Sequence, residues 1–233
     1  MSILEKKIIA FKNWHDKQLP QYEEAVRFFC DLIATVPKVE SVSGRTKSFD
    51  ECISKFKRKY LPQLSPENTQ YKISNYLTDL IGIRAICYYS EDVQEIRRSL
   101  RKYFKEIDIT DKSDLLEKTD DKFGYKSLHL QLVLKPRLKD IIGSEKFKNF
   151  SLELQIRTVI QDAWSRLDHQ IKYKKSIPQN LKRRINRISA LFEIADDEFL
   201  IIKKEIVQEE NKIYRRLKTG SKIDNTKKRL APR

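Results

Sequence analysis

Residues 151–158, Ser-Leu-Glu-Leu-Gln-Ile-Arg-Thr, alternate strictly between apolar and polar side chains. Such alternation is typical of a β-strand with one buried face, because successive side chains of a strand point to opposite sides. The other face presents a carboxylate, an amide and a guanidinium in one row, at Glu153, Gln155 and Arg157. This row can ligate a metal ion, form an orienting hydrogen bond and bind a phosphate along one line. The plainer alternative is that these side chains only form the solvated face of an edge strand.

A second strand of the same kind is predicted over residues 125–133, Tyr-Lys-Ser-Leu-His-Leu-Gln-Leu-Val. Its three leucines form the apolar face, and the opposite face carries Tyr125, Ser127, His129 and Gln131. If the two strands share a sheet with their apolar faces on one side, their polar faces form a continuous floor. Aromatic rings stack on bases and cations bind phosphates, so this floor favours a nucleotide site.

The composition predicts one substantial domain with a helical extension. The chain has 233 residues, of which 39% are hydrophobic, enough for a real core. We find no run of membrane-spanning length and no apolar stretch of a secretory signal at the N-terminus. Three cysteines stand in apolar surroundings without metal-ligand spacing: Cys30, Cys52 and Cys87. They are expected to be buried free thiols in a reducing compartment, the cytoplasm.

The charge is strongly basic, with 48 Lys and Arg against 33 Asp and Glu, a formal net charge of +15. An excess of this size predicts a polyanionic partner, for which nucleotides, RNA and anionic membrane surfaces all qualify. Lysine-rich solvated helices are the plainer explanation for part of it.

Four segments are predicted along the chain. Helices occupy residues 1–37, with Pro20 dividing them into two, and an α/β domain follows over residues 38–175. Helices return over residues 176–218, after Pro178, and the basic tail 219–233 is predicted to be disordered.

The first strand of the α/β domain, residues 39–43, runs into a glycine turn at Gly44-Arg45-Thr46-Lys47. Ser48 is expected to cap the next helix, residues 49–61, with Glu51 as its capping-box partner. A strand, a glycine turn, basic residues and a helix N-terminus form a suitable layout for phosphate binding. A basic turn before a solvated helix is the alternative.

Residues 79–89 are nearly continuously apolar, which predicts a central strand covered on both faces. Asp79 stands at its start and Arg84 lies within it. Charges in a central strand rarely lack a partner. One hypothesis is a structural ion pair between Asp79 and Arg84, and the other is that both face a ligand that carries metal and phosphate.

Four segments, in this order, resemble the synthetase domain of the RelA/SpoT family of alarmone synthetases: residues 44–47, 79–84, 124–129 and 153–158. The resemblance covers about residues 38–175, and the short chain is similar to the small stand-alone members. There is no room for the family's hydrolase domain before these motifs. His15-Asp16, a lookalike of that domain's His-Asp pair, is therefore interpreted as a surface pair.

The resemblance implies an α/β (α+β) fold, a nucleotidyltransferase-like mixed sheet flanked by helices, with helical segments at both ends. It implies an enzyme, a GTP/GDP pyrophosphokinase, that transfers pyrophosphate from ATP to the 3′-hydroxyl of GDP or GTP and makes ppGpp or pppGpp. The residues agree with this chemistry, because phosphoryl-type transfer needs in-line geometry and neutralised charge more than covalent catalysis.

Asp79 and Glu153, on neighbouring strands, are the expected catalytic pair and the expected ligands of a Mg²⁺ that bridges the triphosphate. Glu153 can also accept the proton of the attacking hydroxyl. By resemblance, two guanidinium planes sandwich adenine, those of Arg45 and Arg84. The ATP phosphates would be bound by Lys47, Lys55 and Arg58.

On the acceptor side, the resemblance implies that Tyr125 stacks on the base. It also implies phosphate contacts by Lys126 and His129, and orientation of the floor by Gln155 and Arg157. Asp162, on the helix after the second motif strand, has two open interpretations. It either accepts hydrogen bonds from the ring N–H and amine of guanine, or it is an exposed first-turn acid near the helix dipole.

Two other functions stay open. Some small members of the family resemble toxins that pyrophosphorylate the 3′ end of tRNA, and the net charge favours such a partner, as do the basic helix residues Lys182, Arg183, Arg184 and Arg187. A non-catalytic RNA-binding module is the third hypothesis, against which the intact pair of carboxylates argues. A homo-oligomer through the C-terminal helices and an antitoxin partner also stay open, and no membrane partner is expected.

Overall fold

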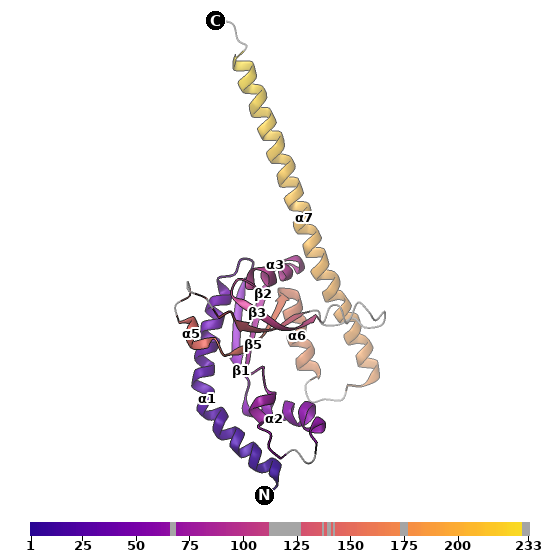
Figure 1. Ribbon diagram of the computed structural model, residues 1–233. Helices are drawn as coiled ribbons and strands as arrows, with labels where there is room; N and C mark the ends of the chain where they lie inside the picture. The colour runs from indigo at the N-terminus through magenta and orange to yellow at the C-terminus, as the bar shows by residue number, and fades with distance from the viewer. Residues whose placement is uncertain are drawn as a thin grey trace.

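The computed structural model describes residues 1–65, 69–111, 127–136, 138, 141, 143–172 and 177–229. These residues form a five-stranded mixed sheet with helices on both of its faces (Figure 1). The α/β fold class that the sequence predicts, with helical segments at both ends, is confirmed.

The strands of the sheet lie in the order β1-β2-β5-β4-β3. Their bounds are Ser41–Thr46 (β1), Ile81–Cys87 (β2), Phe104–Asp111 (β3), Leu128–Leu134 (β4) and Ser151–Thr158 (β5). Strand β5 runs parallel to β2 and antiparallel to β4, with His129 opposite Gln155 and Gln131 opposite Glu153. The two alternating strands therefore share one sheet, which is the condition under which their polar faces form the continuous floor described above.

The helices are α1 (Ile3–Ala34), α2 (Phe49–Lys55), α3 (Ser90–Leu100), α5 (Ser144–Phe147), α6 (Val159–Lys172) and α7 (Gln179–Arg229). Helix α2 continues as a π-helical turn over Phe56–Tyr60 and a 3₁₀ turn over Leu61–Gln63, and a second 3₁₀ turn spans Ile73–Tyr76. Ser48 and Glu51 form the predicted capping box at the start of α2.

Helix α1 covers the apolar face of the sheet as one continuous helix, so the predicted division at Pro20 is wrong. A proline inside a helix costs about 3 kcal/mol through a lost hydrogen bond and a steric clash. Burial on both sides of the proline offsets this cost, since Phe11 lies before it and Phe29 after it, with exposed fractions of 3% and 0%. Tertiary packing therefore overrides the local signal.

Strand β1 runs straight through Gly44, so the predicted glycine turn is wrong. A Cβ atom on Gly44 would lie 2.7 Å from Cys30 Sγ and 2.7 Å from Val26 Cγ1. Both atoms belong to α1, which packs directly on the strand at this point. Glycine is needed here for the close approach of a helix to a strand.

Gly44→Ala is expected to destabilise the fold by about 1–3 kcal/mol, the usual cost of overpacking a core. Urea unfolding followed by circular dichroism measures this free energy. Gly82→Ala is the matched control, because its Cβ atom would meet only the Arg45 carbonyl oxygen, at 3.9 Å. Equal stability of the two variants would contradict the packing explanation.

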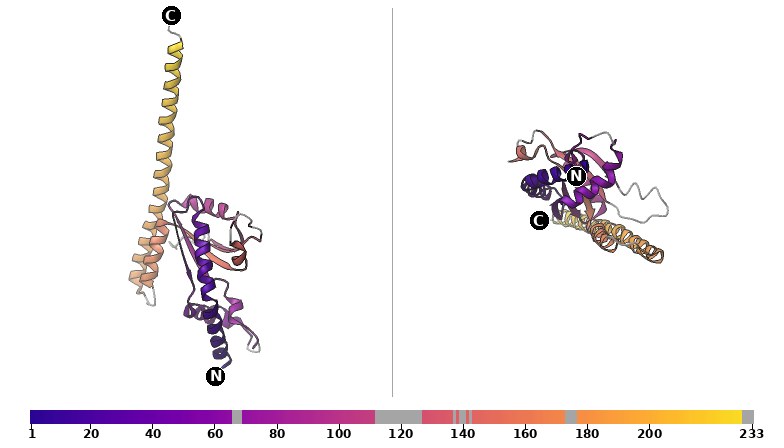
Figure 2. Two further views of the ribbon diagram at one scale, coloured as in Figure 1. Left: turned by 90° about the vertical axis from the view of Figure 1, so that its left-hand side faces the viewer. Right: turned by 90° about the horizontal axis from the view of Figure 1, so that it is seen from below.

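Helices α6 and α7 cover part of the opposite, polar face. Trp164 of α6 and Ile185 of α7 are buried, and the ring centroids of Trp164 and Phe192 lie 5.3 Å apart. Helix α7 has 51 residues, which corresponds to roughly 75 Å at 1.5 Å per residue. Its second half projects away from the sheet (Figure 2).

Helix α7 also differs from the sequence prediction at its end. It continues to Arg229, whereas the sequence predicts disorder from residue 219, and residues 230–233 lie outside the described part. Apart from Gly220, residues 219–229 contain no strong helix breaker, which allows a basic helix to continue. Among the described helices, we find none with the length and apolar character needed to cross a bilayer.

Candidate active site

Two cavities meet at the carboxylates of Asp79 and Glu153, which contribute to the lining of both. The β1–β2 cavity has a volume of about 330 Å³, and its other lining residues include Arg45, Lys47, Gly82, Arg84 and Gln155. The β3–β4 cavity has a volume of about 220 Å³, and its other lining residues include Lys55, Lys59, Tyr60, Asp108, His129 and Gln131. The predicted catalytic pair therefore stands at the junction of two polar cavities.

Asp79 lies just before β2, is only 6% exposed, and binds two lysines. Its Oδ2 atom accepts hydrogen bonds from Lys47 Nζ and from Lys55 Nζ, the latter at 2.6 Å. Burial raises the pKa of Asp79, but the hydrogen bonds and charges of the two lysines outweigh burial and lower this pKa overall. Since Asp79 pairs with lysines, the hypothesis of an Asp79–Arg84 ion pair is wrong.

The main chain around Asp79 is held by three strands. The carbonyl of Thr78 accepts hydrogen bonds from Gln131 Nε2 of β4, at 2.9 Å, and from Ser151 Oγ of β5, at 2.6 Å. The carbonyl of Leu80 accepts one from Lys47 N, just after β1, at 2.8 Å. Ser151 begins the strand that carries Glu153, and its contact with Thr78 could not be predicted from the alternating pattern.

His15 of α1 supports the same region from the other side. Its Nε2 atom lies 3.0 Å from the Lys47 carbonyl oxygen, and the residue is only 8% exposed. The predicted surface pair His15-Asp16 is therefore wrong for His15, whereas the side chain of Asp16 is 60% exposed. The reason is the packing of α1, which places His15 beside the rings of Phe11 and Phe49.

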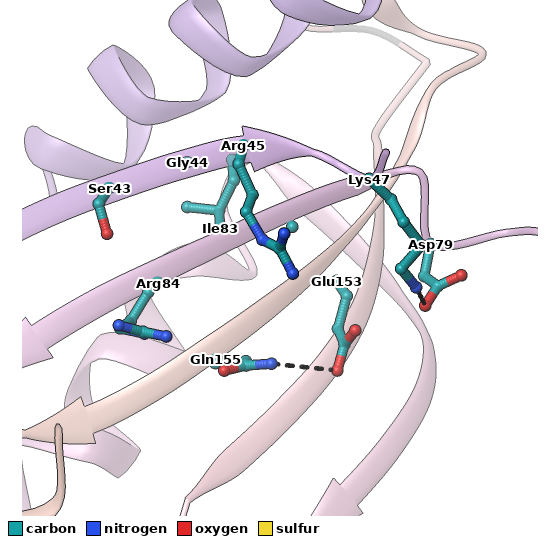
Figure 3. Close-up of a pocket in the computed structure, with 10 residues that line it drawn as sticks. Ser43, Gly44, Arg45, Lys47, Asp79, Ile83, Arg84, Glu153 and Gln155 are labelled. Atoms are coloured by element: carbon teal, nitrogen blue, oxygen red, sulfur yellow. Dashed lines mark hydrogen bonds and ion pairs between the residues drawn. The ribbon is translucent and has the colours of Figure 1, made fainter. Parts of the chain in front are cut away.

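Glu153 projects from β5 into the junction and is held by two side chains. His129 Nδ1 lies 2.8 Å from Glu153 Oε1. Gln155 Nε2 donates a longer hydrogen bond of 3.5 Å to the same oxygen (Figure 3). The hydrogen bond from His129 lowers the pKa of Glu153, and this effect outweighs the opposing effect of burial. Both carboxylates are therefore ionised at neutral pH, the form that binds metals.

Each arginine of the β1–β2 cavity is held by a carboxylate. Arg45 lies opposite Gly82 in the sheet and forms a two-point contact with Glu51, at 2.8 and 3.0 Å. Arg84 Nη1 lies 3.0 Å from Asp162 Oδ1. The two arginines occupy diagonal positions on neighbouring strands, because Arg84 is two residues beyond Gly82.

Asp162 is only 6% exposed, so the hypothesis of an exposed first-turn acid is wrong. Arg157 Nη1 donates to its Oδ1 atom at 3.1 Å, and Arg166 Nε lies 2.7 Å from its Oδ2 atom. Arg157 is itself 4% exposed and also donates hydrogen bonds to Gln155 and Ser165. Together with Arg84, three guanidinium groups therefore surround this one carboxylate.

The remaining predicted residues are distributed unevenly. Lys55 lines the β3–β4 cavity, although it was predicted on the ATP side. Arg58 is exposed on the π-helical turn, and within the described residues it lines neither cavity. Tyr125 and Lys126 lie outside the described residues. The contribution of Tyr60 to the cavity lining was missed, because its place at the end of the basic π-helical turn carries no signal of a site.

The donor set at the junction fits a divalent cation. In the part of the chain that the structure describes, no cluster of three or more His, Cys, Asp or Glu residues has metal-site geometry. Magnesium, however, commonly binds one or two carboxylates and takes its other ligands from water and substrate phosphates. The buried Oδ1 atom of Asp79 has no hydrogen-bond partner among the described residues. This oxygen is available to a metal while Oδ2 is held by lysine.

Comparisons with known proteins identify similar sequences and a matching family model. A family model described as "Region found in RelA / SpoT proteins" matches residues 44–178. The chain is 32% identical over 185 residues to the GTP pyrophosphokinase YjbM of Bacillus subtilis (strain 168), covering 78% of this chain and 80% of that protein. It is 28% identical over 170 residues to the GTP pyrophosphokinase YwaC of the same strain, covering 72% of this chain and 75% of that protein.

A solved structure resembles the fold as well. It is the small alarmone synthetase 1 from Bacillus subtilis bound to its product pppGpp, which matches with a TM-score of 0.63 and 25% sequence identity. The match covers 84% of this chain and 98% of that chain.

Proposed function

This chain belongs to the RelA/SpoT family, and from that membership we propose that it transfers pyrophosphate from ATP to the 3′-hydroxyl of GDP or GTP. Its products are the alarmones ppGpp and pppGpp, which makes it a GTP pyrophosphokinase. The observation that carries the proposal is the junction of two polar cavities at Asp79 and Glu153. Group transfer between two nucleotides requires both to meet in one orientation at one point.

ATP is assigned to the β1–β2 cavity. Diagonal neighbours on adjacent antiparallel strands are roughly 7–8 Å apart, which is about twice the 3.5 Å contact distance between stacked atoms. Arg45 and Arg84 are therefore spaced to hold a planar base between them, and Gly82 places no side chain in the gap. Lys47 and Lys55, which both bind Asp79, are proposed to contact the phosphates at the junction, with Arg58 further out.

The guanine nucleotide is assigned to the β3–β4 cavity. His129 lies within it, and Tyr125 and Lys126 immediately precede the segment that enters β4. We assign base stacking to Tyr125 and phosphate contacts to Lys126 and His129. Gln155 and Arg157 form a hydrogen-bonded row behind Glu153, which supports their assignment as orienting residues.

The reaction is an attack of the acceptor 3′-oxygen on the β-phosphorus of ATP. The bond between this phosphorus and the α–β bridging oxygen breaks, AMP leaves, and Glu153 accepts the hydroxyl proton. When bound, a Mg²⁺ held by Asp79 and Glu153 supplies charge neutralisation on the transferred group. Lys47 and Lys55 add positive charge at the same point.

We propose a cytoplasmic location for the protein. ATP, the proposed donor, is supplied there, and the three free cysteines suit a reducing compartment.

The test uses ATP labelled on its γ-phosphate, with GDP, GTP or bulk tRNA offered separately. Label is expected in GDP and GTP and absent from tRNA. Labelling of tRNA without labelling of either nucleotide would replace the proposed acceptor by RNA. Failure to label any acceptor would reject the proposed function.

One observation keeps RNA as the second candidate acceptor. Four cations at the start of α7 are all exposed: Lys182, Arg183, Arg184 and Arg187. If they bind RNA phosphates, changing three of them to Ala is expected to flatten the dependence of log affinity on log salt by about 2–3 units. RNA affinity measured at several salt concentrations, with GDP labelling as the control, checks this. An unchanged slope would mean that the four cations form only a solvated face.

A second copy of the chain is the other partner that we propose. Helix α7 exposes large apolar side chains along its length, including Leu191 (63% exposed), Ile194 (62%), Phe199 (54%) and Ile206 (53%). Isolated soluble domains rarely expose so much apolar surface. Light scattering is expected to give a multiple of the monomer mass, reduced by Leu191→Lys with Phe199→Lys. A monomeric wild type would contradict self-association and leave an antitoxin as the occupant to test.

A further inference from the structure

The two arginines of the β1–β2 cavity share an arrangement that their motifs do not reveal. Each is held by a carboxylate from the first turn of a helix that follows a strand: Glu51 of α2 holds Arg45, and Asp162 of α6 holds Arg84. We propose that Glu51 and Asp162 are positioning residues that set the two guanidinium planes for the adenine of ATP, and that Asp162 serves the donor pocket instead of reading guanine. The inference rests on the proposed function, because it takes ATP as the donor.

The surroundings of Asp162 favour an anchor over a base-reading role. A carboxylate offers about four lone-pair sites. Here Oδ1 contacts Arg84 Nη1 at 3.0 Å and Arg157 Nη1 at 3.1 Å, and Oδ2 contacts Arg166 Nε at 2.7 Å. A guanine edge would have to displace contacts to cations that are stronger than hydrogen bonds between neutral groups. The occupied carboxylate therefore suits the holding of Arg84.

Arg157 makes this anchor rigid. It is 4% exposed and donates to both Asp162 and Ser165, so the carboxylate is fixed from the buried side. Arg84 contacts the carboxylate from the cavity side, with 32% of its side chain exposed. A fixed carboxylate therefore determines where the guanidinium of Arg84 lies before ATP arrives.

Glu51 plays the equivalent part for Arg45. Both of its oxygens contact the guanidinium, while Oε2 also accepts a hydrogen bond from Ser48 N at 3.0 Å as part of the helix cap. Arg45 is otherwise 68% exposed, so without this contact its long side chain would sample many rotamers. Ordering the side chain before ATP binds removes a conformational-entropy cost that would otherwise weaken binding.

The decisive measurement is the steady-state KM of Asp162→Asn for ATP and for GDP, each determined at saturating concentration of the other. We expect the KM for ATP to rise about tenfold or more, with the KM for GDP changed less than about twofold. Arg166→Ala is the matched control, because it removes a contact to Asp162 from a side chain that is 67% exposed and leaves Arg84 in place. A rise in the KM for GDP alone would overturn the inference in favour of guanine reading.

A double-mutant cycle tests whether Asp162 acts through Arg84. If it does, Asp162→Asn adds little to the KM for ATP of Arg84→Ala. Additive effects would overturn the proposal.

Glu51→Gln provides an independent variant, because glutamine preserves the capping box and the site is on the exposed side of the cavity. Its KM for ATP is expected to rise severalfold at unchanged melting temperature. If Asp162→Asn fails to fold, an unchanged KM in Glu51→Gln is sufficient to overturn the inference. Calorimetric titration with a non-hydrolysable ATP analogue separates the two claims. It measures the affinity for the ATP analogue, and therefore the effect of Glu51 and Asp162 on the two arginines, without requiring turnover. This measurement stays informative even if wild-type protein labels neither GDP nor GTP, which is the result that rejects the proposed function.

Discussion

Glu153→Gln is expected to lower metal-dependent turnover at least about 100-fold, the scale for loss of a preorganised charge in a transition state. The substitution keeps the size of the side chain but removes the charge that a metal ligand or proton acceptor needs. Asp79→Asn is expected to have a similar effect. Turnover is measured as labelled product per enzyme at saturating ATP, GDP and magnesium.

The two variants differ in their expected effect on stability. The side chain of Glu153 is 30% exposed, whereas that of Asp79 is 7% exposed and faces two lysines. Hydrogen bonds to charged groups contribute about 1.5–3 kcal/mol each, so Asp79→Asn is expected to lower the melting temperature more. Glu106→Gln serves as the control, since its carboxylate is paired with Arg97 and Arg101 outside both cavities. Near-wild-type turnover in Glu153→Gln or Asp79→Asn would reject the metal assignment.

Tyr125→Ala is expected to raise the KM for the acceptor roughly tenfold to a hundredfold and to leave ATP binding nearly unchanged. Stacking of a base on an aromatic side chain contributes about 1–3 kcal/mol, which corresponds to this range of affinity. Initial rates at varied GDP, together with titration of an ATP analogue, check both halves of the expectation.

Tyr125→Phe is the matched control, because it keeps the ring and removes only the hydroxyl. Its KM for the acceptor is expected to stay close to wild type. A comparable loss of ATP binding in Tyr125→Ala, with the KM for the acceptor unchanged, would mean that the two nucleotides occupy the opposite cavities.

The faces of the strands could be predicted from the sequence because the side-chain period of a strand is fixed at two. Once Leu154 is assigned to the core, Glu153 and Gln155 must lie on the other face, and a shift of one residue would bury them. The same argument places His129 on β4. Alternation therefore predicted which residues form the polar floor of the site, whereas the pairing of the two strands is seen only in the structure.

The partners of the charged residues could not be predicted in this way. Asp79 is paired with Lys47 and Lys55, and Arg84 with Asp162, across separations that no local pattern encodes. A periodic pattern gives the face of a residue, but the neighbour on that face depends on how distant segments pack. For the same reason the burial of His15 was missed.

The contact between His15 and the Lys47 carbonyl shows that the site depends on residues that precede the family match. The region that matches the RelA/SpoT family model begins at residue 44. The structural support of Lys47 begins on α1, which also packs against Gly44 through Val26 and Cys30. A protein trimmed to the recognised segment would retain every motif and lose the support on which its first lysine rests. The region that identifies the family is therefore shorter than the shortest chain that we expect to catalyse the reaction.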